Sequence, residues 1–318
     1  MRTPRTTARG QPDLDRCAGA LLGLAAGDAL GAGYEFRAPP TGPAQMIGGG
    51  LGGWGPGEWT DDTQMAICIA EEAATGALSP GKVAERFLEW FHAGPADVGL
   101  QTSDVLRSAR SAAELPAAAA ERFERRPHNS AGNGSLMRTA PVALAALGDD
   151  QVIAIMAREI SSLTHADPVA GDACVLWCTA IDRAVREGRL DGAYDGLGLL
   201  PASRQGAWAG RVDEARMRPP EHFSPNGYVV AALQAALSAI WHTPVPADVP
   251  CQHLQDALQA AVKVGDDTDT VAAIAGSLLG ARWGATAVPT DWAVALHGWP
   301  GYRAADLVRL ASIHRVTP

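Results

Sequence analysis

The chain has 318 residues, of which 47% are hydrophobic and 19% charged, so it can bury a sizeable core and lacks the composition of a disordered protein. Its formal net charge of −9 disfavours binding to a nucleic-acid backbone, which normally requires a basic face. Five cysteines without a regular spacing indicate packed free thiols in a reducing compartment, so we expect a cytoplasmic protein.

Residues 1–13 contain three arginines and no apolar core after them, so this segment is not a secretory signal and is expected to be a flexible tail. Its arginine and threonine content would also suit a transit peptide. The apolar stretch 17–27 is too short to span a bilayer and ends at Asp28, so we predict no membrane segment. A lone acid inside an apolar, glycine-rich helix is costly unless it is paired, which predicts a structural role for Asp28.

Further along the chain, apolar residues repeat at the three- and four-residue spacing of helices, and the two-residue alternation of strands is nearly absent. Ser79 and Pro80 supply an N-cap and a first-turn proline for one of these helices. Small residues in two of the apolar segments indicate closely packed helices. The predicted helices cover 17–33, 82–92, 150–163, 169–188, 227–242, 253–265 and 271–284.

Two long segments, 37–59 and 189–226, lack a helical period and are predicted to be irregular. The second contains enough leucine, tryptophan and alanine to suit an ordered loop better than a flexible linker. Since no solenoid repeat stands out, we expect an all-α fold with a single compact multi-helix domain over residues 14–318.

Two acidic, threonine-rich motifs stand at the starts of apolar helices. In the first, 60–63, Thr60 or Asp61 could be an N-cap, and Asp61 with Gln64 resembles a capping box. The second, 266–270, places three carboxylates within four residues, which is more than capping requires. We therefore predict that the motifs converge on shared cations, with Mg²⁺ or Mn²⁺ favoured by hard oxygen ligands. The residues do not match the twelve-residue calcium loop, which makes Ca²⁺ the weaker alternative.

Other candidate residues have ordinary structural interpretations when each is taken alone. Glu35 could be a solvated acid that begins a loop, and Asp97 a turn or cap residue. His165 could be an ordinary helix-end histidine, and Tyr228 a core side chain. The glycines in 129–138 would either form a tight turn or let backbone N–H groups approach phosphate oxygens, although the lysine of a Walker loop is missing.

Taken together and in this order, the motifs resemble those of the ADP-ribosylglycohydrolase family, especially the bacterial branch typified by the dinitrogenase-reductase-activating glycohydrolase. The resemblance runs from about residue 15 to the end of the chain. The pair of threonine–aspartate motifs at this separation is its most specific part. The matching segments are GALLGLAAGDALGAGYEF (19–36), GEWTDDTQMA (57–66), ADVG (96–99), NSAGNGSLMRTAP (129–141), LTHADP (163–168), GYVVAALQAAL (227–237) and GDDTDTVAAIAGSLLGA (265–281).

The resemblance implies an all-α fold with a cleft that holds two Mg²⁺ or Mn²⁺ ions. It makes Glu35 a mobile catalytic glutamate that activates water and Asp97 a ribose contact and candidate acid/base partner. Asp266 replaces a glycine common in the family and is left out of the metal ligands. The implied metal ligands are Thr60, Asp61, Asp62, Asp267, Asp269 and Thr270, and the implied substrate contacts are Ser130, Gly132, Asn133, Gly134, Ser135, His165 and Tyr228.

The activity implied by the resemblance is hydrolysis of the N- or O-glycosidic bond between ADP-ribose and an acceptor, with arginine on proteins as the first choice. Serine-linked ADP-ribose and O-acetyl-ADP-ribose are alternative substrates. A non-catalytic ADP-ribose-binding protein and a calcium-stabilised structural protein are alternatives from other classes. The expected partners are ADP-ribose and an ADP-ribosylated protein, without nucleic acid or membrane, and the chain is expected to be a monomer.

Overall fold

The computed structural model describes residues 13–312, and within them it contains fifteen α-helices and one two-stranded sheet. The prediction of an all-α fold is therefore confirmed. The strands β1 (His297–Gly298) and β2 (Tyr302–Arg303) pair antiparallel, with His297 opposite Arg303. The helices are α1 (Leu14–Gly31), α2 (Asp61–Ala73), α3 (Pro80–His92), α4 (Leu100–Ser108), α5 (Leu115–Arg125), α6 (Ala140–Ala145), α7 (Asp150–Ser162), α8 (Pro168–Glu187), α9 (Ala193–Gly196), α10 (Ala202–Met217), α11 (Val229–His242), α12 (Gln252–Lys263), α13 (Thr268–Trp283), α14 (Thr290–Ala295) and α15 (Ala304–Ser312).

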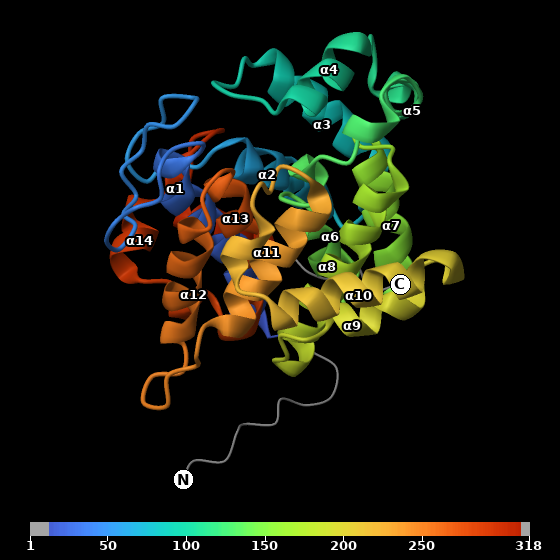
Figure 1. The fold of residues 1–318 in the computed structure, drawn as a ribbon. Helices are drawn as coiled ribbons and strands as arrows, with labels where there is room; N and C mark the ends of the chain where they lie inside the picture. The colour runs from blue at the N-terminus through green and yellow to red at the C-terminus, as the bar shows by residue number, and fades with distance from the viewer. Residues whose placement is uncertain (1–12, 313–318) are drawn as a thin grey trace.

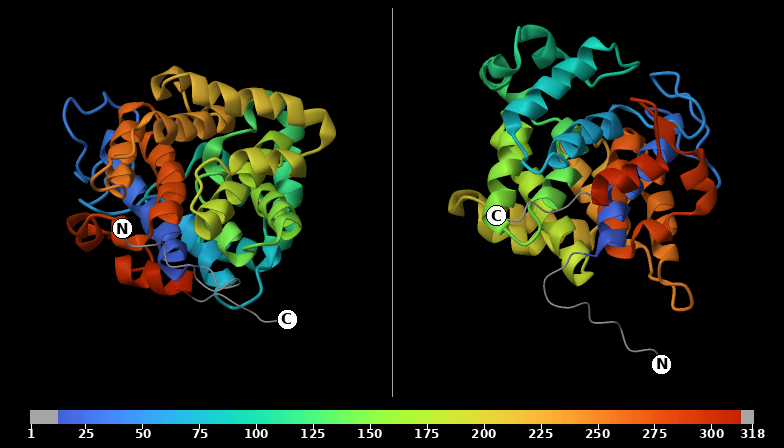
Figure 2. Two further views of the ribbon diagram at one scale, coloured as in Figure 1. Left: turned by 90° about the horizontal axis from the view of Figure 1, so that it is seen from below. Right: turned by 180° about the vertical axis from the view of Figure 1, so that it is seen from behind.

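Helices α1 and α13 form a central pair whose backbones touch (Figures 1 and 2). A Cβ atom on Gly23 would lie 2.2 Å from the carbonyl oxygen of Gly276, and one on Gly27 would lie 2.0 Å from that of Ala272. Only glycine permits such an approach, because any larger side chain would push the helices apart. The predicted close packing of these two segments is confirmed.

The apolar helix at the start of the chain begins three residues earlier and ends two residues earlier than the predicted range 17–33. Together with the turn that follows it, the stretch Leu14–Tyr34 is long and apolar enough to cross a membrane by length and composition, but 94% of it is buried by the rest of the protein. It has the burial expected of the central helix of a core. Its N-cap is Asp13, whose side chain accepts N–H bonds from Asp15 and Arg16, so Asp13 belongs to this helix rather than to the predicted tail. Residues 1–12 of that tail lie outside the described residues.

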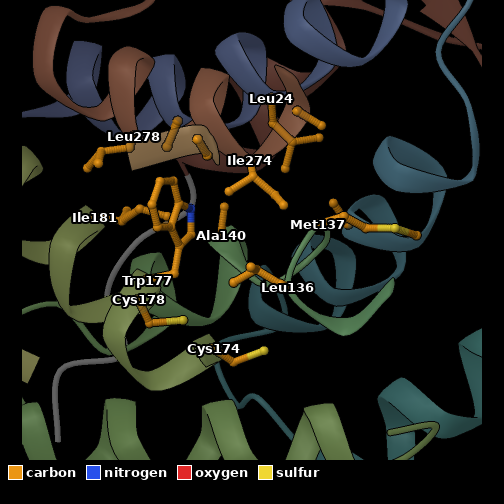
Figure 3. Close-up of a cluster of buried hydrophobic side chains, with 14 of the residues drawn as sticks. Leu24, Leu136, Met137, Ala140, Cys174, Trp177, Cys178, Ile181, Ile274 and Leu278 are labelled. Carbon is orange, nitrogen blue, oxygen red and sulfur yellow. The ribbon is translucent and has the colours of Figure 1, made fainter. Parts of the chain in front are cut away.

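The main core lies between the α1–α13 pair and α8 (Figure 3). Trp177 of α8 is fully buried there, and its indole N–H donates to Ser277 Oγ of α13 at 2.9 Å. Cys174 and Cys178 are free and buried on the same helix, which confirms the prediction of packed thiols.

The segment 37–59 contains no helix or paired strand, as predicted, but the prediction of an irregular segment over 189–226 is wrong. It holds the short helix α9 and the sixteen-residue helix α10. In α10, Trp208, Val212 and Ala215 are buried at helical spacing. This narrow stripe is diluted by exposed glycines and charged residues, which hid the helical period in the sequence.

Candidate functional site

The two acidic motifs meet at the starts of α2 and α13. The hydroxyl Oγ1 of Thr270 donates to Asp62 Oδ1 at 3.1 Å, across 208 positions of sequence. Asp62 Oδ2 also accepts from Thr60 Oγ1 at 3.0 Å. The structure therefore brings together the side chains that the sequence analysis predicted to converge.

Helix α2 begins at the first motif because side chains of two residues, Thr60 and Asp28, accept the free N–H groups at its start. Thr60 is the N-cap, and its Oγ1 accepts the N–H of Asp62. Asp28 of α1, which is fully buried, accepts N–H bonds from Thr60 and Thr63 and the hydroxyl of Thr63. This confirms the structural role predicted for Asp28. The predicted capping box is wrong, because Gln64 instead donates to the carbonyl of Trp59 and accepts from a tryptophan of α3.

Helix α13 begins at the second motif without using its carboxylates as caps. Asp267 occupies the N-cap position but forms no side-chain cap bond; its Oδ2 accepts from Asn133 Nδ2 at 2.7 Å. Thr268 Oγ1 donates to the carbonyl of Gly31 at 2.9 Å, which joins the start of α13 to the end of α1. The carboxylates of this motif are therefore left for another role.

We call the buried carboxylates of this region the acidic cluster: Glu35, Asp61, Asp62, Asp267 and Asp269. Burial, followed by the charge of neighbouring acids, raises the pKa of Asp61 to about 7 and that of Glu35 to about 8. The same causes raise the pKa of Asp62 and Asp269 well above the usual value. Such shifts are typical of carboxylates held together without a counter-charge.

The negative charge of the acidic cluster is not balanced by an ion pair with any cationic side chain in the described part of the chain, which favours the binding of divalent cations. No lysine or arginine there forms an ion pair with these carboxylates, and Glu35 Oε2 is enclosed without a hydrogen-bond partner. Two sets of three carboxylates place oxygens within 4.8 Å of one another and could each hold a metal ion; they share Asp269. Hard oxygen donors in this number suit Mg²⁺ or Mn²⁺. The sets are Asp28–Asp62–Asp269 and Glu35–Asp267–Asp269.

Asp97 lies beside the acidic cluster in the loop between α3 and α4. It is half-buried, and its charge is the first neighbouring charge that raises the pKa of Asp61. The N–H of Gly99, two residues later, donates to Asp61 Oδ2 at 3.4 Å. The loop therefore places Asp97 close enough for its charge to act on both Asp61 and Glu35.

Residues 129–135, which we call the glycine loop, run antiparallel to the segment before α11. Asn133 N–H donates to the carbonyl of Gly227 at 3.1 Å, and Gly132 pairs with Tyr228. A pocket of about 430 Å³ opens next to this pairing. Tyr228 is 47% exposed, which rules out the alternative that it is a core side chain. The pocket is lined by Pro127, His128, Asn129, Ala131, Gly132, Asp167, Gly227 and Tyr228.

The two serines of the glycine loop differ from the expectation that their hydroxyls face a phosphate. Ser130 Oγ donates to the carbonyl of Arg126 and accepts from Arg122. Ser135 Oγ is buried against Ser161 and Cys174. The structure engages both hydroxyls with protein groups, and in the same loop the N–H of Gly132 donates to Gln101 Oε1 and that of Asn133 to the carbonyl of Gly227.

His165 lies directly beneath the glycine loop. A Cβ atom on Gly134 would come within 3.1 Å of its ring, and one on Gly132 within 3.4 Å, so the two glycines allow the ring to approach the loop. Its Nδ1 is 2.7 Å from Thr164 Oγ1. Burial, and then the charges of Arg138 and Arg122, lower the pKa of His165 well below the usual value, so the ring is neutral.

Three residues that support the site carried no recognisable signal in the sequence. Gln101, at the start of α4, donates to the carbonyls of Ser130 and Thr164 and so fastens the glycine loop to the histidine. Asn226 bonds the backbones of Gly265 and Asp267. Arg138 follows the loop and is fully buried. Single polar residues in turns are too common for spacing to single them out.

Asp266 adopts a left-handed backbone conformation, with φ of 56°. Its carboxylate accepts a hydrogen bond from Ser224, and its carbonyl accepts the N–H of Phe36 at 2.7 Å. Its charge also raises the pKa of Asp267, but less than burial does. Asp266 therefore ties the loops around the site together and directs its own carboxylate away from the acidic cluster.

The sequence and the fold of this chain are similar to those of one group of known proteins. A family model described as ADP-ribosylglycohydrolase matches residues 9–317. The ADP-ribosylarginine hydrolase Tri1 of Pseudomonas putida (strain GB-1) is 33% identical over 286 residues, which cover 88% of this chain and 73% of that protein. The ADP-ribosyl-[dinitrogen reductase] glycohydrolase of Rhodospirillum rubrum is 30% identical over 290 residues, which cover 87% of this chain and 89% of that protein. A solved structure described as an ADP-ribosylglycohydrolase-related protein complex superposes with a TM-score of 0.71 at 30% identity, over 94% of this chain and 96% of that one.

Proposed function

Because the chain belongs to the ADP-ribosylglycohydrolase family, whose members hydrolyse glycosidic bonds, we propose that it releases ADP-ribose from ADP-ribosylated arginine on proteins in a metal-dependent reaction. The observation that carries the proposal is the convergence of the two acidic motifs beside the glycine loop. Asn133 connects the two regions directly, because it belongs to the loop and donates to Asp267. The arginine linkage is supported by the relatives described above, one of which is named an ADP-ribosylarginine hydrolase.

We propose that the acidic cluster holds two Mg²⁺ or Mn²⁺ ions. The support is the enclosed, unpartnered Glu35 Oε2 and the raised pKa values of carboxylates that lack a counter-charge. When bound, such ions would offset the repulsion between the carboxylates and polarise ribose hydroxyls and water. The residues that we propose to hold them are Thr60, Asp61, Asp62, Asp267, Asp269 and Thr270. Asp62, Asp267 and Asp269 belong to the two sets of converging oxygens, which also include Asp28 and Glu35.

In this mechanism Glu35 accepts a proton from the attacking water. Its Oε2 has no hydrogen bond to the protein, and the charge of bound cations would keep the carboxylate ionised and able to take that proton. Breaking the bond at the anomeric carbon of the ribose develops positive charge there, which the surrounding carboxylates stabilise. Asp97 lies near Asp61 and would assist as an acid/base partner.

The rest of ADP-ribose would lie along the glycine loop. His165 fills the space beside Gly132 and Gly134, so phosphate oxygens would approach the loop from the side of the adjoining pocket. Tyr228 is exposed at the rim of the adjoining pocket and offers a ring on which adenine can stack. Asn133 donates to Asp267 of the acidic cluster, which supports a position of the ribose to be cleaved beside the carboxylates.

The proposal is tested by incubating the protein with ADP-ribosyl-arginine, serine-linked ADP-ribose and O-acetyl-ADP-ribose, with and without EDTA, and measuring free ADP-ribose. We expect release from the arginine conjugate, its loss with EDTA and its recovery with Mn²⁺ or Mg²⁺. D61A and D269A should abolish turnover, whereas D248A, which removes an exposed acid from the loop between α11 and α12, should leave it unchanged. Full activity in both site variants would refute the metal-centred mechanism, and binding of ADP-ribose without release from any conjugate would indicate a non-catalytic binding protein.

A further inference from the structure

Arg138 is a fully buried cation without an ion-pair partner in the described part of the chain. Its guanidinium lies 4.5 Å from the ring centroid of Phe87, and its Nη1 donates to Met65 Sδ. Its Nη2 donates a short hydrogen bond of 2.6 Å to Thr164 Oγ1. Since a guanidinium can only donate, Thr164 Oγ1 must be the acceptor of this bond.

The hydrogen bond from Arg138 to Thr164 determines the direction of the hydrogen bond between Thr164 and His165. The Thr164 side chain is fully buried, so its own hydroxyl proton needs an acceptor, and leaving it without one would cost about 1–3 kcal/mol. The acceptor within reach is His165 Nδ1, at 2.7 Å. Thr164 therefore donates to Nδ1, and because the imidazole is neutral, its single proton must be on Nε2.

The proton on Nε2 points to the space between the two glycines of the loop. A Cβ atom on Gly132 or Gly134 would lie within 3.4 Å of Nε2, so this nitrogen directly faces both residues. Nε2 has no hydrogen bond to any described residue. Nε2 is not fully enclosed by the described residues.

We propose that Arg138 and Thr164 are positioning residues that fix His165 in the tautomer with its proton on Nε2, so that this N–H is offered through the glycine loop to an oxygen of the bound ligand. The resemblance implies a donor role for His165, and the two residues behind it supply the physical reason. The identity of the ligand, a phosphate or ribose oxygen of ADP-ribose, rests on the proposed function, whereas the tautomer does not.

The experiment combines a spectroscopic and a binding measurement. Long-range ¹H–¹⁵N spectra of the ligand-free protein identify the protonated nitrogen of His165, with H165Q used to assign its signals. We expect the wild-type protein and T164S to carry the proton on Nε2. T164V, which keeps the volume but removes the hydroxyl, should populate the Nδ1-protonated tautomer. T179V is the matched control, because Thr179 is a fully buried threonine whose hydroxyl bonds only within its own helix.

Binding of ADP-ribose, measured by calorimetry, should weaken about ten- to a hundredfold in T164V, as for the loss of one hydrogen bond to a charged group. It should stay near the wild-type value in T164S and T179V. In hydrolysis, T164V should raise KM more than it lowers kcat. If T164V folds poorly, because it leaves a buried guanidinium hydrogen without an acceptor, the wild-type and T164S spectra still decide the assignment.

A wild-type spectrum with the proton on Nδ1, or a folded T164V with the wild-type tautomer and affinity, would overturn the proposal. Failure of the proposed function has a different signature. If the wild-type protein carries the proton on Nε2 but neither binds ADP-ribose nor hydrolyses its conjugates, the tautomer assignment stands and the proposed ligand is wrong.

Discussion

Neutralising one carboxylate of the acidic cluster should stabilise the metal-free protein while it destroys the reaction. Asp61 is nearly buried, and burial and the charge of Asp97 raise its pKa from 3.8 to about 7. A carboxylate whose pKa is higher in the folded state favours folding fully only below its unfolded pKa, and this contribution is lost as the pH rises through the folded value. In D61N this loss is absent, because asparagine does not ionise.

The size of the effect follows from the shift. A difference of about three pKa units corresponds to about 4 kcal/mol at pH 8, because each unit is worth about 1.4 kcal/mol. Most of this cost develops as the pH rises, so the stability advantage of D61N over the wild type should grow by roughly 2–3 kcal/mol between pH 5 and pH 8. Divalent cations act in the opposite direction, since saturation at a hundred times Kd stabilises the wild type by about 2.7 kcal/mol.

The assay is urea denaturation of protein that has been stripped of metal with EDTA, at several pH values between 5 and 8, with and without Mg²⁺ or Mn²⁺. D61N should be more stable than the wild type at pH 8 without metal, should respond little to cations and should release no ADP-ribose. D248N is the control for the change in net charge and should follow the wild type. Equal stability of D61N and the wild type at pH 8, or a difference that does not depend on pH, would refute the electrostatic reasoning.

Three further substitutions test other parts of the site. E35Q removes the base and should lower turnover by about 10²–10⁴-fold, with ADP-ribose binding measured by calorimetry changed by less than about tenfold. Y228A should weaken ADP-ribose binding by about ten- to a hundredfold through loss of stacking, whereas Y228F should not. G27A would place a Cβ atom 2.0 Å from the carbonyl of Ala272 and should destabilise the protein by about 3 kcal/mol or more in urea denaturation, whereas G210A, at an exposed α10 position with open space around it, should have little effect or stabilise slightly.

The features that could be predicted from the sequence are those that depend on short motifs. Three carboxylates within 266–270 exceed what a helix cap needs, and in the structure Asp267 at the N-cap of α13 forms no side-chain cap bond. Asp28 could be predicted to be paired because burial of an isolated acid is so costly. These predictions depend on local composition and on the free energy of burying charge, both of which a single sequence contains.

Features that depend on tertiary contacts could not be predicted in this way. The hydroxyl of Ser135 looked available for a phosphate, but α7 and α8 supply Ser161 and Cys174 to cover it. Gln101 fastens the glycine loop from a helix about thirty positions earlier in the chain. The period of α10 was hidden because its buried stripe is narrow and the exposed positions include glycines.

The close packing of α1 and α13 is what converts two distant motifs into one site. A Cβ atom on Gly31 would lie 2.4 Å from Asp269 Cα, and Thr268 is bonded to the Gly31 carbonyl, so the end of one helix fixes the start of the other. Thr268 and Asp269 are thus positioned by helix backbones in direct contact. Repulsion that acts on Asp269 when no cation is present should then appear largely as lost stability. For this reason the small residues of the central helices, whose sequence pattern indicated only close packing, should also affect the affinity for the proposed cations.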